Sequence, residues 1–288
     1  MATRVRLANE NKPYTAISTN RTLFSRSRLF ESVLENTTAF VTGASQGLGR
    51  EIAVAFGDAG ANVVLAARSD GIYETEQQID APDRTLAVET DVTDPDSVAD
   101  SIDAAVDEFG GLDCLVNNAG IAGPTAPIED TDDDEWLETM DVNVVGTART
   151  VRAAAQSLRD SEAGSIVNIS SIGGKRPYPN RTPYAASKMG VIGLTRALAF
   201  EFGDDDVTVN AICPGPVEGE RIENVFEKQA AERGVDVADV KGEVLESLAI
   251  RELVPPEEVA DLAVQLASPA TDHVTGQDIN VASGGAWY

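Results

Sequence analysis

The stretch TAFVTGASQGLG at residues 38–49 decides the fold. Its first five residues form an apolar, β-branched run that predicts a buried strand. The run REIAVAFGDAG at 50–60 follows directly and predicts a helix. A glycine-rich turn between strand and helix brings backbone N–H groups toward a bound pyrophosphate, although a purely structural turn is the alternative. The turn residues that we predict to bind a dinucleotide are Gly43, Ser45, Gln46, Gly47, Leu48 and Gly49.

Strand and helix patterns alternate along the rest of the chain. This alternation predicts one α/β domain with a doubly wound parallel sheet, a Rossmann fold, over residues 37–288. Helices are expected at 94–110, where Asp94 and Pro95 occupy cap positions, at 136–159 and at 184–202. Further strands are expected at 62–68, 85–92, 112–120, 164–171, 207–215 and 277–281.

The charge balance is strongly acidic. The chain has 22 Lys and Arg against 48 Asp and Glu, a net charge of −26. Such a surface repels nucleic acid and anionic membranes, so neither is an expected partner. It suits a cytoplasm of molar salt, where the Debye length falls to about 3 Å. We therefore expect a halophilic source, with an acidic mesophilic protein as the alternative.

Residues 1–36 differ from the body because they hold six basic and three acidic residues. We expect a basic amino-terminal extension over 1–36, for which disorder is one interpretation. It is either an arm that lies on the acidic body or a partner subunit, or the product of a start site placed too early. In the second case, initiation near Val33 would begin the chain just before its first strand.

Cysteine and histidine usage argues against a metal site. Cys114 and Cys213 stand alone in apolar runs, which predicts buried thiols in a reducing compartment. His273 is the only histidine, and no cluster has metal-ligand spacing. No apolar run approaches the roughly 20 residues of a membrane span. We expect a cytoplasmic protein without a metal.

Tyr184 and Lys188 are the first candidates for chemistry. They lie four residues apart and would share one face of a helix. An adjacent ammonium favours phenolate and brings a phenol with a pKa near 10 toward the working range. Ser171, after an apolar strand, and Asn143 are candidate third and fourth members. A helix-capping serine and an asparagine that bonds a backbone carbonyl are the alternatives.

These residues resemble the short-chain dehydrogenase/reductase family over roughly residues 37–285. The resemblance implies hydride exchange with a nicotinamide while Tyr184 exchanges a proton with the substrate oxygen. It also implies that Ser171 hydrogen-bonds that oxygen, that Lys188 binds the nicotinamide ribose and lowers the Tyr184 pKa, and that Asn143 holds a water. The motifs, in family order, are TGASQGLG at 42–49, Asp91-Val92, NNAG at 117–120, Asn143, Ser171, YAASK at 184–188 and Pro214-Gly215.

By the same resemblance, the end of the second strand sets the cofactor, and enzymes for NAD carry an acid there. This chain has Ala67 and then Arg68, which can grip a 2′-phosphate, so NADP is the preferred cofactor and NAD remains possible. A solvated surface arginine is the alternative interpretation. The family often places a threonine shortly after Pro214-Gly215, where this chain has Pro216-Val217. The remaining residues predicted to bind cofactor are Asp91, Val92, Asn118, Ala119, Gly120, Tyr184, Lys188, Pro214, Gly215 and Val217.

The resemblance further implies a helical substrate lid at about 219–254 and a homotetramer. Lys175, Arg176 and Arg181 precede Tyr184 and favour an anionic substrate or, alternatively, pairing with acids of a neighbouring subunit. We predict an NADP(H)-preferring oxidoreductase that interconverts a secondary alcohol and a ketone, the substrate being a 3-oxoacyl thioester, keto acid or sugar acid. The alternatives are an NAD-dependent sugar or sugar-acid dehydrogenase and a non-catalytic dinucleotide-binding redox sensor.

Overall fold

The computed structural model describes residues 32–79 and 81–286. In these residues seven strands form one sheet in the order β3-β2-β1-β4-β5-β6-β7, and every neighbouring pair is parallel. The predicted doubly wound α/β sheet is therefore confirmed. The strands are β1 (Thr38–Thr42), β2 (Asn62–Ala67), β3 (Thr85–Glu89), β4 (Cys114–Asn117), β5 (Ser165–Ile169), β6 (Thr208–Pro214) and β7 (Asp278–Val281).

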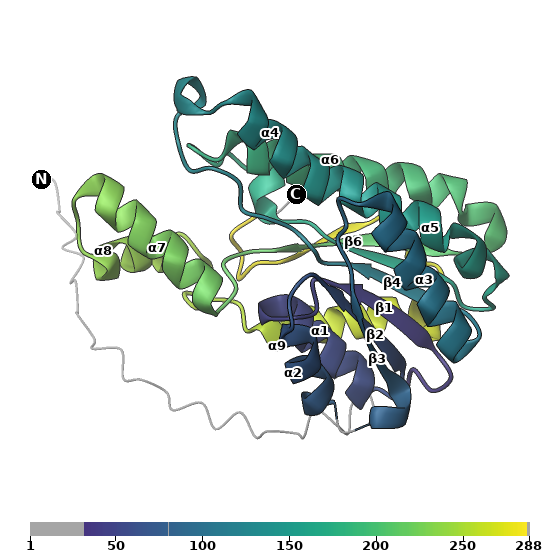
Figure 1. The fold of residues 1–288 in the computed structure, drawn as a ribbon. Helices are drawn as coiled ribbons and strands as arrows, with labels where there is room; N and C mark the ends of the chain where they lie inside the picture. The colour runs from purple at the N-terminus through teal and green to yellow at the C-terminus, as the bar shows by residue number, and fades with distance from the viewer. Residues whose placement is uncertain (1–31, 80, 287–288) are drawn as a thin grey trace, which may run out of the picture.

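Helices cover both faces of the sheet (Figure 1). In β1, Ala39 and Val41 pack with α1 and α9, whereas Phe40 packs with α3, α5 and α6. All three side chains are buried, because crossover helices cover a parallel sheet on both sides. The helices are α1 (Gly47–Asp58), α2 (Gly71–Gln78), α3 (Pro95–Phe109), α4 (Asp133–Met140), α5 (Gly146–Asp160), α6 (Thr182–Glu201), α7 (Glu220–Arg233), α8 (Val237–Glu246) and α9 (Pro256–Leu266).

The expected helix at 136–159 consists of two helices. A π-helical turn, Asp141–Val145, joins α4 to α5, and hydrophobic spacing does not reveal such a turn. The predictions also omit α2 and α9, although α9 begins at a proline and packs against α1. Short 3₁₀ helices lie at Pro82–Arg84, Ile128–Asp130, Ile172–Gly174, Gly203–Asp205 and Pro269–Thr271.

Helices α7 and α8 lie apart from the sheet, at the left of Figure 1. They share a small apolar cluster that contains Phe226, Ala230 and Val240. At the base of this pair, a parallel bridge joins Val217 to Val254. The chain therefore leaves the body and returns to it at one place, between β6 and α9.

The predicted extension at 1–36 lies largely outside the described residues. Leu34 is fully buried, and its N–H donates to the Ala59 carbonyl oxygen over 2.9 Å. The packed body thus starts at least three residues before residue 37. Cys114 and Cys213 are both buried as predicted, and burial raises the pKa values of their thiols to about 12 and about 11. None of the described helices is long and apolar enough to cross a membrane.

Candidate active site

The glycine turn lies between β1 and β4, where the order of the sheet reverses and where such sheets bind ligands. Gly43 has a φ of +66°, which residues with a side chain rarely adopt. A Cβ atom on Gly49 would lie 2.1 Å from the Gly43 carbonyl oxygen and 2.3 Å from Nδ2 of Asn118. Glycine is therefore required at position 49 by the close approach of α1 to the turn.

The segment after β4 holds this turn in place. The N–H groups of Asn118 and Ala119 both donate to Oγ1 of Thr42 over 3.0 Å. The Asn118 side chain donates to the carbonyl oxygens of Thr42 and Gly43 over 3.0 and 3.2 Å. Two of the three predicted cofactor residues of this segment, Asn118 and Ala119, thus support the glycine turn through protein contacts.

The first turn of α1 is open to an anion. Gln46 precedes the helix without a side-chain cap, and the first turn contains no acid. A Cβ on Gly47 would have nothing within 4 Å, so space lies beside these N–H groups. Uncapped N–H groups at a helix start bind phosphate, so the turn fits a dinucleotide pyrophosphate. Leu48 packs against the core, and Ser45 is only 8% exposed, which leaves little of its hydroxyl for a ligand.

Arg68 follows directly after β2 and reaches the segment after β3. Its Nη1 lies 3.7 Å from Oδ2 of Asp91, and the arginine side chain is 64% exposed. Burial alone would raise the pKa of Asp91. Hydrogen bonds from Thr93 and the charges of Arg68 and Arg149 outweigh burial and lower this pKa. Val92 accepts a hydrogen bond from Arg149 through its carbonyl oxygen. Arg68 is thus exposed at the sheet edge and only loosely paired.

Tyr184 and Lys188 lie on α6, one turn apart. Nζ of Lys188 is 5.9 Å from the centroid of the Tyr184 ring and donates to the Ile169 carbonyl oxygen over 2.9 Å. Lys188 is only 5% exposed. Oγ of Ser171 accepts from the Gly173 N–H over 3.0 Å, so Ser171 also caps a short helix, as in its structural interpretation.

The surroundings of Tyr184 favour its phenolate. Burial alone would raise its pKa, but Lys188, Arg221, a hydrogen bond with Ser171 and Arg181 together lower the pKa below the ordinary value. Burial lowers the pKa of Lys188, and the nearby phenolate opposes that effect. A phenol with a lowered pKa is suited to exchange a proton near neutral pH.

Asn143 lies in the π-helical turn and is 1% exposed. Its Nδ2 donates to the Ile121 carbonyl oxygen over 3.0 Å and to Oγ of Ser187 over 2.9 Å, and its Oδ1 accepts from the Ile121 N–H. A Cβ on Gly120 would lie 3.0 Å from Asn143 Oδ1 and 3.4 Å from Lys188 Nζ. The asparagine side chain thus positions the segment after β4 beside α6, which fits the alternative of an asparagine bonded to a backbone carbonyl.

Pro214 is the last residue of β6 and pairs with Val281 of β7, and Gly215 follows directly after the strand. The Gly215 N–H donates to the Val281 carbonyl oxygen, and a Cβ on Gly215 would lie 2.8 Å from Cα of Ala282. Val217 belongs to the bridge at the base of α7 and α8. These three predicted cofactor residues line the path from the sheet to the helical pair.

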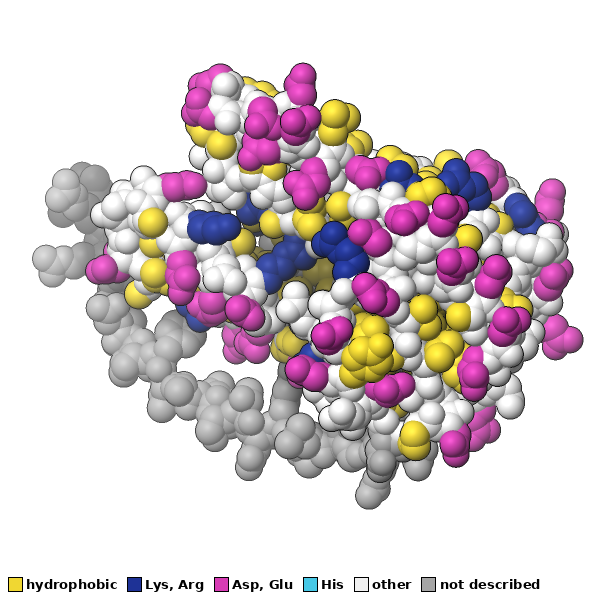
Figure 2. Space-filling view, viewed as in Figure 1, with side chains coloured by type: hydrophobic (Ala, Val, Ile, Leu, Met, Phe, Trp, Pro, Cys, Tyr) yellow, Lys and Arg dark blue, Asp and Glu magenta, His cyan; other side chains and the backbone are white. Residues whose placement is uncertain are grey.

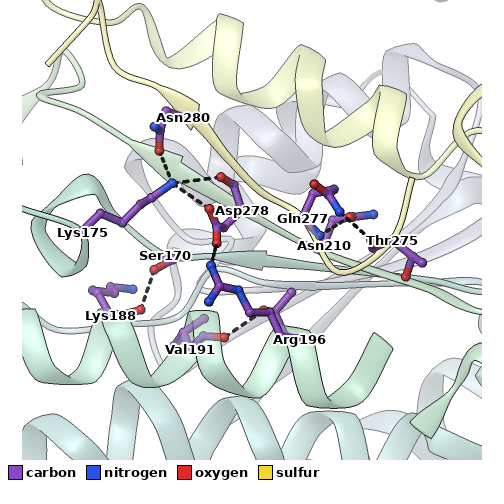
Figure 3. A network of polar contacts seen from close by, with 11 residues as sticks. Ser170, Lys175, Lys188, Val191, Arg196, Asn210, Thr275, Gln277, Asp278 and Asn280 are labelled. Atoms are coloured by element: carbon purple, nitrogen blue, oxygen red, sulfur yellow. Dashed lines mark hydrogen bonds and ion pairs between the residues drawn. The ribbon is translucent and has the colours of Figure 1, made fainter. Parts of the chain in front are cut away.

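The three basic residues of the loop between β5 and α6 lie in different surroundings. Lys175 does not face the substrate side: its Nζ donates to Oδ1 of Asp278 over 2.7 Å and to Oδ1 of Asn280 over 2.9 Å (Figure 3). Arg196 pairs with the same Asp278 carboxylate. Burial alone would raise the pKa of Asp278, but hydrogen bonds from Lys175 and Arg196 lower it. Arg176 approaches the Gly285 carbonyl oxygen.

Arg181 lies at the site itself. Its guanidinium carbon is 5.1 Å from the centroid of the Tyr184 ring and 5.3 Å from that of Tyr178. It is 4% exposed and donates to the Ala122 carbonyl oxygen over 2.9 Å. Of the three basic residues in the loop, only Arg181 contacts the Tyr184 ring.

Sequence reasoning missed Arg221. Its guanidinium carbon lies 5.9 Å from the centroid of the Tyr184 ring, although it belongs to the first turn of α7. No motif marks it, because its approach depends on the placement of the helical pair. Figure 2 shows basic side chains around the hollow between this pair and the body, while acidic side chains dominate the rest of that face.

No group of three or more His, Cys, Asp or Glu side chains capable of holding a metal occurs in the part of the chain that the structure describes. The groups that surround Tyr184 are the Ser171 hydroxyl, the Lys188 ammonium and the guanidinium groups of Arg181 and Arg221.

Comparison with known proteins identifies several similar chains. Residues 43–286 match a family model described as enoyl-(acyl carrier protein) reductase. A cis-4-hydroxycyclohexanecarboxylate dehydrogenase of Sinomonas cyclohexanicum is 36% identical over 85% of this chain and 95% of its own length. A D-beta-hydroxybutyrate dehydrogenase of Rhizobium meliloti is 34% identical over 86% of this chain and 97% of its own length. A crystal structure of an actinorhodin polyketide ketoreductase variant with NADPH has a TM-score of 0.83 at 33% identity and covers 88% of this chain and 98% of that one.

Proposed function

The chain belongs to the short-chain dehydrogenase/reductase family and is an NAD(P)-dependent oxidoreductase that acts on CH–OH groups. From this premise we propose that it prefers NADP(H) and takes an anionic substrate. The single observation that carries the reaction is the placement of three cations, Lys188, Arg181 and Arg221, within 5.9 Å of the centroid of the Tyr184 ring. The substrate is a secondary alcohol in one direction and a ketone in the other.

In this proposal Tyr184 donates a proton to the carbonyl oxygen during reduction and accepts it during oxidation. Ser171 hydrogen-bonds the same oxygen and so aligns the carbonyl with the phenol. Lys188 stabilises the phenolate through its charge and holds the ribose next to the nicotinamide. The nicotinamide, when bound, supplies or accepts the hydride. Asn143 positions the segment after β4, and its predicted water remains a prediction.

The preference for NADP(H) rests on the end of β2. Ala67 offers no carboxylate to the adenosine ribose, and Arg68 is exposed and only loosely paired with Asp91. A 2′-phosphate carries more charge than this carboxylate and can bind the planar guanidinium through two hydrogen bonds. The similar ketoreductase that holds NADPH supports the same choice.

The proposal of an anionic substrate rests on Arg181 and Arg221, since Lys175 is committed to Asp278. Two similar proteins are named for hydroxycarboxylates, cis-4-hydroxycyclohexanecarboxylate and D-beta-hydroxybutyrate. We propose that α7 and α8, with the segment from 219 to 254, form the lid over this substrate.

Fluorescence titration in molar KCl with NADPH and with NADH tests the cofactor proposal. Tighter binding of NADPH supports it, and tighter binding of NADH favours the NAD-dependent dehydrogenase. A screen of ketones and sugar acids with the better cofactor then tests the reaction. Binding without turnover of any of them would favour the redox sensor.

We also propose a cytoplasmic homotetramer adapted to high salt. Val191 and Ile192 of α6 are buried within the chain, but Met189 is 46% exposed and Phe200 is 90% exposed, which suits contact with a second copy. Light scattering in molar KCl should give the mass of four chains. A monomer under these conditions would refute the assembly.

A further inference from the structure

Arg181 is a buried cation that has no matching carboxylate among the described residues. In the described part of the chain, no Asp or Glu oxygen lies within ion-pair distance of its guanidinium, and its Nε is buried without a hydrogen-bond partner. Its partners are one carbonyl oxygen and two aromatic rings. Burial of an incompletely neutralised charge is costly, so a nearby anion would be strongly favoured.

Arg221 of α7 supplies a second cation beside the Tyr184 ring. It is exposed and makes no ion pair within the described residues, whereas Arg233 and Lys241 of the same helical pair bind Glu243 and Glu223. Among the described residues, no carboxylate therefore competes with a bound anion for the Arg221 guanidinium. Arg221 thus keeps its hydrogen-bonding groups available beside the Tyr184 ring.

The distances limit where the anion sits. Arg181 and Arg221 lie 5.1 and 5.9 Å from the centroid of the ring that carries the reacting oxygen. An anion between these groups is consequently only a few bonds from the reacting carbon of the substrate. A keto acid or sugar acid meets this limit, whereas the phosphates of an acyl thioester lie at the far end of a long arm.

We propose that the substrate carries a carboxylate a few bonds from its reacting carbon, that Arg221 of α7 binds this carboxylate directly, and that Arg181 is the buried cation behind it. This inference rests on the proposed function and narrows its substrate to short hydroxy and keto acids. Arg221 is therefore a residue that determines specificity, and it belongs to the lid rather than to the sheet.

Matched acids and esters test the inference with NADPH as the hydride donor. The probes are 3-oxobutanoate, 4-oxopentanoate and 4-oxocyclohexanecarboxylate, each with its methyl ester. We expect kcat/KM for at least one acid to exceed that for its ester by tenfold or more, because the ester lacks the charge. Arg221→Gln should reduce kcat/KM for that acid by about 10- to 100-fold, the range for loss of a charged hydrogen bond, and should affect its ester several-fold less. Arg221→Lys should restore part of the loss.

Lys228→Gln is the matched control, since it removes one positive charge from the exposed surface of the same helix. It should leave the acid-to-ester ratio within twofold of the original. Equal losses for acid and ester in Arg221→Gln would overturn the inference and assign Arg221 to Tyr184 alone. Esters reduced as well as acids by the unmodified enzyme would overturn it too, together with the proposed anionic substrate, while the proposed NADP(H)-dependent reduction of a ketone would stand.

Binding of pentanoate gives a readout without turnover. Quenching of bound NADPH fluorescence should report pentanoate binding to the enzyme, and Arg221→Gln should weaken it about tenfold or more. If no ketone is reduced but pentanoate still binds through Arg221, the proposed function fails and the anion site remains. Absence of Arg221-dependent binding would remove the site itself.

Discussion

Lys175 and Arg181 are six residues apart in one loop, yet they lie in regions of opposite electrostatic character. Lys175 is closed off by Asp278 and Asn280, so its charge is used entirely within the protein. Arg181 lies between two aromatic rings and has no carboxylate among the described residues. A cation beside the Tyr184 ring therefore marks the functional side more clearly than the cluster of basic residues in the sequence does.

Tyr184→Phe, a change in the region around Arg181, is expected to have the largest effect of all. Removal of the phenol oxygen takes away the proton donor, so kcat should fall about 100- to 10 000-fold. Steady-state kinetics with the best ketone, together with NADPH titration, measures this change. NADPH affinity should stay within a few-fold, and a variant with nearly normal kcat would show that another group transfers the proton.

Asp278→Asn changes the other region, the buried ion pair of Lys175. It leaves the buried Lys175 ammonium without a counter-charge, although an amide oxygen can still accept its hydrogen bond. The free energy of unfolding should drop by roughly 2 to 3 kcal/mol, somewhat below the cost of leaving a buried charge wholly unpaired. Denaturant unfolding measures it, and the acid-to-ester preference should persist.

The contribution of the Lys175–Asp278 ion pair to stability should depend on pH in a definite direction. The folded pKa of Asp278 is lowered, so its contribution is complete above the ordinary value of 3.8 and is lost as the pH falls through the lowered pKa. Asp278→Asn should therefore be most destabilising near neutral pH and least so in strong acid. Asp272→Asn, an exposed site, is the control, and an equal loss there would contradict the assignment to the buried pair.

Arg68→Ala removes a cation that is exposed and only loosely paired with Asp91, so its pairing falls between that of Lys175 and that of Arg181. We expect weaker NADPH binding by about tenfold, with little change for NADH, because only NADPH offers a 2′-phosphate. Fluorescence titration of both cofactors gives the ratio. Parallel weakening of both would mean that Arg68 contacts a part that the two cofactors share.

The smallest expected effect is on the titration of Tyr184. Because Arg221 helps to lower the phenol pKa, Arg221→Gln should raise the apparent pKa seen in the pH profile of alcohol oxidation. Phenolate is the proton acceptor, so the rate should rise with pH in both enzymes but at higher pH in the variant. An unchanged profile would mean that solvent screens the Arg221 charge.

Sequence patterns predicted the sheet and the position of Tyr184 and Lys188, since both depend on local spacing. The strands are short apolar runs, and the pair on α6 follows from a separation of four residues. Arg221 and the Lys175–Asp278 pair could not be predicted in this way. Their contacts join residues 37 and 103 positions apart, and nothing in local spacing encodes such distances.

Asn143 illustrates a partial success. The sequence marked Asn143 as a candidate site residue, but its side chain is hydrogen-bonded to the Ile121 carbonyl oxygen and to the Ser187 hydroxyl. That arrangement depends on the π-helical turn, whose extra residue shifts the register of the helix. Hydrophobic periodicity averages over several turns and does not detect one added residue.

The bridge between Val217 and Val254 has an evolutionary consequence. Because the segment between them starts and ends at adjacent points, recombination could replace it with one of another length without altering the sheet. Loop closure costs only about 0.6 kcal/mol for each doubling of length, so such exchanges are thermodynamically mild. A new segment would bring its own counterpart of Arg221 to the same tyrosine. The architecture thus allows the segment that selects acidic or neutral substrates to be exchanged as one unit, without change to the residues that carry out hydride transfer.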